Sequence, residues 1–111
     1  MYDISLWEKR LQEKYAERER VRQQELAKAV QALRDYFADK NVKAVYLTGS
    51  VLKEGRFHSF SDIDVAVEGF EGDYFRTLVE LEALLDRDVD LIELEKCLFR
   101  EQIIQRGLRI L

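Results

Sequence analysis

The chain has 111 residues, of which 47% are hydrophobic and 36% charged, and its formal net charge is −4 at pH 7. This length suits a single domain with one modest core, and this composition excludes a disordered chain. The acidic balance argues against direct binding of nucleic acid, and no apolar run is long enough to span a membrane. Because Cys97 is the single cysteine, no intramolecular disulfide can form, and we expect a cytoplasmic protein.

A long helix is predicted over residues 4–39, which contain no glycine or proline. Its apolar residues form two groups, separated by the nearly all-polar residues 16–25. A straight helix of this length reaches roughly 54 Å, farther than the rest of the chain can cover. We therefore expect residues 26–111 to form the domain, and residues 1–25 to be a helical extension that projects, bends back or meets a partner. The two apolar groups are Trp7, Leu11 and Tyr15, then Leu26, Val30, Leu33 and Phe37.

Shorter elements follow the long helix, separated by turn residues. Asn41 fits a left-handed cap at the end of that helix. In the last expected helix, over residues 96–106, Phe99 and Ile103 are expected to face inward. These elements predict an α/β (α+β) fold, a small mixed sheet with helices packed mainly on one face. The expected elements are strands over 42–48, 62–67, 88–94 and 108–111, and helices over 74–85 and 96–106.

Two aspartates, Asp62 and Asp64, interrupt the hydrophobic run of the second strand. Side chains alternate along a strand, so both carboxylates should point to one face while their neighbours build the core. Carboxylates this close repel each other unless one is protonated or a cation bridges them, and their hard oxygen atoms suit Mg²⁺. Asp90 in the next strand would complete a triad able to hold two metal ions. Asp88 competes for this third position, and spacing alone does not separate the two.

A bend at Gly49 and Ser50 ends the first strand. Glycine lets a phosphate approach the main chain, and the serine hydroxyl and the following amides can donate to phosphate oxygens. Placed beside the acids, this bend predicts a site for a metal-bound triphosphate.

The loop after this bend carries residues of less certain role. Lys53 and Arg56 could neutralise a triphosphate, although loops of mixed charge are commonly just solvated. Phe57 and Phe60 are expected to anchor the loop to the core, and His58 to be exposed to solvent.

In this order, "LTGS", "SDIDVAV" and "VDLIEL" resemble the motifs of the minimal nucleotidyltransferases of the DNA polymerase β superfamily. The resemblance covers residues 42–94 and implies a nucleoside triphosphate site with two Mg²⁺ ions. The loop between the bend and the first acid is one residue longer than is usual in the family, which leaves its phosphate contacts open. The residues carried over are Gly49 and Ser50 for the triphosphate, Asp62 and Asp64 for the metals, and Asp90 as metal ligand and base.

The resemblance also implies a biological setting. Stand-alone domains of this size often act as antitoxins of helical HEPN toxins, moving AMP from ATP onto a tyrosine hydroxyl of the toxin. The group formed by Trp7, Leu11 and Tyr15 would be a docking face, or would pack on its own domain or on a second copy in a homo-oligomer. The rival hypothesis is a non-catalytic antitoxin that neutralises its partner by complex formation. Transfer to a small molecule is disfavoured, because such relatives usually carry an additional helical domain.

Overall fold

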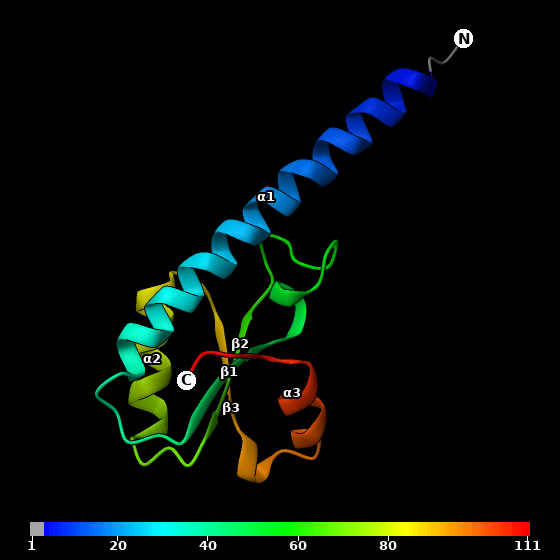
Figure 1. The fold of residues 1–111 in the computed structure, drawn as a ribbon. Coiled ribbons are helices and arrows are strands. Elements are labelled where there is room, and N and C mark those ends of the chain that lie inside the picture. Colours follow the sequence, from blue (N-terminus) through cyan, green and yellow to red (C-terminus); the bar gives the residue numbers. More distant parts are fainter. Residues whose placement is uncertain (1–3) are drawn as a thin grey trace.

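The structure is a computed structural model that describes residues 4–111, so residues 1–3 of the expected extension lie outside the described part. Each predicted helix and strand is present, with ends shifted by a few residues (Figure 1). The largest shift is in the last helix, which starts at residue 100. The elements are α1 (Ile4–Phe37), β1 (Ala44–Thr48), the 3₁₀ turn η1 (Gly49–Leu52), β2 (Ile63–Glu68), α2 (Tyr74–Leu85), β3 (Val89–Glu93), the 3₁₀ turn η2 (Leu94–Lys96), α3 (Arg100–Arg106) and β4 (Leu108–Arg109).

The four strands form one mixed sheet in the order β3-β2-β1-β4. β1 runs antiparallel to β2 and β4, whereas β2 and β3 are parallel, with α2 as the crossover between them. Asp73 caps the start of α2, because its carboxylate accepts a hydrogen bond from the Arg76 amide at 2.9 Å. Asp86 ends the helix in the left-handed conformation, with φ 51°, and turns the chain toward β3.

Both faces of the sheet are covered. Val45 and Val65 point to the face on which α1 and α2 pack, and the large core lies between them. Tyr46 and Ala66 point to the opposite face and pack with Ile103 of α3. The two long helices thus lie on one side of the sheet and the short α3 on the other (Figure 1). This confirms the expected mixed sheet with helices mainly on one face.

Only the C-terminal half of α1 lies on the sheet, where Ala29, Leu33 and Phe37 are buried. The N-terminal half projects beyond the body as part of the same helix (Figure 1), and the molecule measures 62 × 28 × 19 Å. In this half, Trp7 and Leu11 are 61% and 56% exposed. α1 is long enough for a membrane span but charged throughout, and within residues 4–111 no helix has both the length and the apolarity to cross one.

Three expectations about single residues are wrong. Asn41 is not a left-handed cap, because Asp86 is the only non-glycine residue within residues 4–111 that has a positive φ. The Asn41 side chain instead donates a hydrogen bond to the Glu71 carboxylate, which ties the end of α1 to the segment before α2. Phe99 is exposed because it precedes the first turn of α3, and Phe60 is exposed in a turn of the loop before β2.

Candidate functional site

The ends of three strands bring Thr48, Asp64 and Asp90 into one row across the sheet. Thr48 of β1 is the register partner of Asp64 of β2, and Asp64 is the register partner of Asp90 of β3. Residues in register on neighbouring strands project to the same face, so the two carboxylates are neighbours. This is the face that α3 covers farther along the strands, at Tyr46 and Ala66. The acids therefore lie at the end of the α3 face, where the loop after η1 also begins.

The carboxyl group of Asp64 shows how closely the acids converge. Burial, then the charge of Asp90 and then that of Asp62, raises the pKa of Asp64 from its ordinary value of 3.8 to about 6. Asp90 and Asp62 therefore lie near enough for their charges to act on Asp64, and the three residues are called the acid cluster below. Asp62 contributes from the exposed residue just before β2, rather than from within the strand as expected.

The third acid of this cluster is Asp90 rather than Asp88. Asp88 precedes β3, and its main-chain carbonyl accepts a hydrogen bond from the Ile63 amide at 3.0 Å. It lines a hollow together with Ser59 and Asp86, and it is not among the charges that shift the pKa of Asp64. The strand register therefore places Asp90, and not Asp88, opposite Asp64.

Gly49 lies directly against Asp64. Its φ of 81° is in the left-handed region, and a Cβ atom at this position would overlap the Asp64 carboxylate. Only glycine combines this backbone conformation with this close approach. Gly49 and Asp64 are consequently in close contact, although a loop separates them in the sequence.

A cavity of about 280 Å³ opens beside Gly49, between the start of η1 and α3. Ser50 lies in η1, where its carbonyl accepts a hydrogen bond from the Lys53 amide at 3.0 Å. Lys53 and Arg106 bring positive charge to the cavity wall, which favours an anionic ligand next to the acid cluster. The lining residues are Thr48, Gly49, Leu52, Lys53, Gln102, Ile103 and Arg106.

Sequence reasoning missed Gln102 and Arg106, which α3 places at this cavity. They are four residues apart and thus share one side of a helix, and Gln102 directly precedes the buried Ile103. That spacing was the available signal, but nothing in the sequence showed that this side of α3 faces the bend.

Arg87 was also missed, and it holds the end of the loop before Asp62. Its guanidinium donates hydrogen bonds to the carbonyls of His58 and Ser61 at 3.1 and 2.9 Å. It also lies over the ring of Phe57, at 4.6 Å from the centroid. Phe57 is buried, as predicted, and His58 is exposed, as predicted.

The donor set of the acid cluster fits Mg²⁺ when further oxygen ligands complete the coordination. Among residues 4–111, no three acidic, histidine or cysteine side chains are gathered closely enough to hold a metal ion by themselves. Mg²⁺ commonly binds one or two carboxylates together with substrate phosphates and water. Asp62, Asp64 and Asp90 offer oxygen atoms of this kind, and the Gly49 bend leaves room for the main chain to approach a phosphate.

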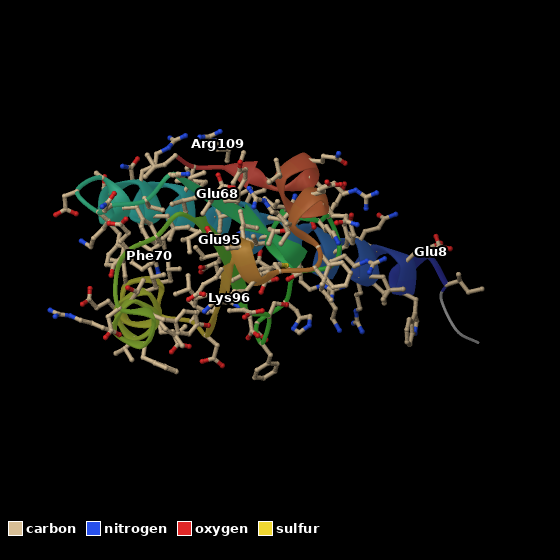
Figure 2. The ribbon with its side chains drawn as sticks, turned by 90° about the horizontal axis from the view of Figure 1, so that it is seen from below. Glu8, Glu68, Phe70, Glu95, Lys96 and Arg109 are labelled. Carbon is tan, nitrogen blue, oxygen red and sulfur yellow. The ribbon has the colours of Figure 1, made fainter. Side chains whose placement is uncertain are left out.

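The opposite end of the sheet also gathers acidic residues, but Glu68 and Glu95 already have bonding partners there. Figure 2 shows Glu68 and Glu95 close together at this end, with Glu8 far out on α1. Glu68 pairs with Arg100 at 2.6 Å, and Glu95 accepts a hydrogen bond from the Gly69 amide at 2.5 Å. This end is therefore accounted for by structural contacts.

Residues 31–111 match the family described as "Polymerase beta, Nucleotidyltransferase". The matched range contains the whole sheet, the acid cluster and the bend, and it begins within α1. Residues 1–30 lie outside it. No curated protein matches this chain.

Solved structures of toxin–antitoxin complexes contain chains similar to this one. A crystal structure of a toxin–antitoxin with AMP-PNP matches at 27% identity and TM-score 0.61, covering 74% of this chain and 72% of that chain. A structure of MntA–HepT matches at 26% identity and TM-score 0.51, covering 80% and 71%. A mutant of that complex matches at 30% identity and TM-score 0.53, covering 72% and 66%.

Proposed function

The chain belongs to the polymerase β nucleotidyltransferase family, and on this premise we propose that it transfers AMP from ATP to a hydroxyl group of a partner protein. The partner we propose is a HEPN-type toxin, with this chain as its antitoxin. Two findings support this assignment. One similar structure is a toxin–antitoxin with AMP-PNP, and others are MntA–HepT toxin–antitoxin complexes.

One observation carries the assignment of the site: Gly49 touches Asp64, and Asp64 stands in register with Asp90. A triphosphate bound at the bend would therefore lie beside the acids. We assign Gly49 and Ser50 to triphosphate binding, by main-chain amides and by the serine hydroxyl. Lys53, at the cavity wall, adds a positive charge for the same ligand.

The acids would hold Mg²⁺, with Asp62 and Asp64 as the proposed ligands of two ions and Asp90 as a further ligand. When bound, the metal neutralises negative charge on the phosphate oxygens. Desolvation and like charges make an ionised, unbridged Asp64 unfavourable, and this is the electrostatic setting in which a bound cation is favoured.

The chemical step we propose is an in-line displacement. The acceptor hydroxyl oxygen forms a bond to the α-phosphorus of ATP, while the bond between that phosphorus and the bridging oxygen to the β-phosphate breaks. Pyrophosphate leaves, and the hydroxyl proton passes to the carboxylate of Asp90, which is exposed at the sheet edge and thus accessible to an acceptor. Positioning and electrostatic stabilisation supply most of the rate enhancement in such transfers.

Transfer of label from α-labelled ATP to a purified HEPN-type toxin, in the presence of Mg²⁺, tests the proposal. Asp90→Asn should reduce the transfer rate by at least about a hundredfold, because general base and charge effects together have this size. Asp88→Asn is the matched control, since Asp88 lies two residues away but outside the cluster, and its rate should stay within about twofold of wild type.

The outcome also discriminates between the two hypotheses for this chain. If wild type leaves the toxin unlabelled but binds and inactivates it, the chain is a non-catalytic antitoxin and the proposed reaction is wrong. Equal loss in both variants would contradict the assignment of Asp90.

Three further expectations remain predictions. They are the division into an extension of residues 1–25 and a domain of residues 26–111, the cytoplasmic location, and any homo-oligomer.

A further inference from the structure

The middle of α1 is hydrogen-bonded to the loop that follows the Gly-Ser bend. Arg22 donates to the main-chain carbonyl of Val51 at 3.1 Å, and Glu19 accepts from the amide of Gly55 at 2.7 Å. Figure 1 shows this loop rising alongside α1, at the point where the helix leaves the body. The loop is thus fixed from α1 at two main-chain groups that are four residues apart.

A third contact reinforces these two bonds. The Tyr15 hydroxyl donates to the Glu54 carboxylate at 2.5 Å, and the Tyr15 ring lies beside Gly55, within ordinary contact distance of where a Cβ atom would be. Gly55 itself has a φ of 75°, so the loop reverses sharply where α1 holds it.

Glu19 and Arg22 form a shielded ion pair. Their charged groups are 2.9 Å apart, and their side chains are only 14% and 12% exposed. Glu17 and Arg20 form a pair at the same helical spacing, but their side chains are 57% and 59% exposed and have no described bond to the loop. The first pair is therefore built into a contact, whereas the second belongs to the solvated side of the helix.

Both charges of the shielded pair are committed to this contact. The Arg22 guanidinium, and next the Gly55 amide, lower the pKa of the Glu19 carboxyl, which stays ionised at neutral pH. Removing either side chain would leave the other partly desolvated and a main-chain group without its bond, so the pair constrains the loop strongly.

The held segment contains Lys53. The main chain before Lys53 is held at Val51, whose side chain is also buried in the core. The main chain after Lys53 is held at Gly55. The Lys53 side chain lines the cavity beside Gly49, together with Arg106. The bonds from α1 therefore hold the main chain on both sides of Lys53.

We infer that Glu19 and Arg22 are positioning residues for nucleotide binding, which act by holding Lys53 toward the triphosphate. This inference rests on the proposed function, since it assigns a role within that same site. Both residues precede the range that matches the family, residues 31–111, so the matched domain does not include them. The projecting helix thus contributes to the site through the loop and not only through its own surface.

Calorimetric titration of the full chain with ATP and with AMP, each with Mg²⁺, tests this role. Glu19→Ala should weaken ATP binding about tenfold, because the Lys53 charge, once displaced, loses most of its contribution to binding the triphosphate. The affinity for AMP, which lacks the β- and γ-phosphates, should fall by less than about twofold. Glu17→Ala is the matched control and should bind both nucleotides as wild type does. Glu19→Gln keeps an oxygen for the Gly55 amide and should recover part of the loss.

A double-mutant cycle shows whether the effect passes through Lys53. If it does, Glu19→Ala should have little further effect on ATP affinity in a Lys53→Ala background, since coupled residues are not additive. If Glu19→Ala weakens ATP binding by the same factor with and without Lys53→Ala, the inference is wrong. It is also wrong if Glu19→Ala binds ATP as tightly as wild type. An equal loss for ATP and AMP would also overturn it and indicate general loosening. Failure of wild type itself to bind ATP would overturn the proposed function and this inference with it.

Discussion

At the scale of single residues, the site depends on a carboxyl group, that of Asp64, whose ionised form the fold makes unfavourable. Asp64 is partly buried between Gly49 and Asp90, and its pKa is raised to about 6 by burial and by the neighbouring acids. The ionised form of this side chain therefore costs stability in the folded protein. The unfavourable charge is explained if a cation bound together with substrate compensates for it.

The pH dependence of stability follows from this pKa. The folded state keeps the Asp64 proton up to about pH 6, whereas the unfolded state releases it near pH 3.8, so stability falls as pH rises through this window. Asp64→Asn should remove this loss and, without Mg²⁺, be about 1–2 kcal/mol more stable than wild type at pH 7.5, after a discount for solvent screening. The difference should vanish near pH 4.

Urea denaturation at several pH values, with a chelator present, measures this difference. Asp39→Asn is a suitable control, because Lys40 lowers the pKa of Asp39 and its neutral variant should gain no stability. A stability difference for Asp64→Asn that is the same at pH 4 and pH 7.5 would contradict the electrostatic interpretation.

At the scale of elements, sequence periodicity was sufficient to find each helix and strand, because amphipathic spacing reports local geometry directly. It also placed Asp62 and Asp64 within the strand over 62–67, although Asp62 lies just before β2. Where it failed, the missing information was tertiary: Asn41 bonds to Glu71, thirty residues away, instead of capping α1. Phe99 was expected to face the core from within the last helix. α3 instead starts at Arg100, so Phe99 precedes the helix and is exposed.

The two halves of α1 should respond differently to the same substitution. Leu33 is fully buried against the sheet, so Leu33→Ala should lower the free energy of unfolding by about 2–5 kcal/mol. Leu11 lies in the projecting half and is 56% exposed, so Leu11→Ala should change it by less than about 0.5 kcal/mol. Chemical denaturation of both variants measures this, and similar losses would show that the projecting half is packed in solution.

At the scale of the whole molecule, the site is assembled from parts that are distant in the sequence. The bend lies in η1, directly after β1, and Asp64 and Asp90 lie in β2 and β3. One cavity wall comes from α3, and α1 supports the loop. The sequence motifs predicted the bend and the acids, because these are short patterns with a fixed order. They could not predict Arg106, Arg87 or Glu19, whose contacts depend on how whole elements pack.

The mass of a HEPN-type toxin co-expressed with this chain tests the central claim most directly. With wild type, the toxin should gain the mass of one or more AMP units. With Asp64→Asn, the toxin should gain none, while the chain should remain folded with unchanged or higher stability. A toxin that is modified equally in both cases, or in neither, would contradict nucleotidyl transfer at the row of Asp64 and Asp90.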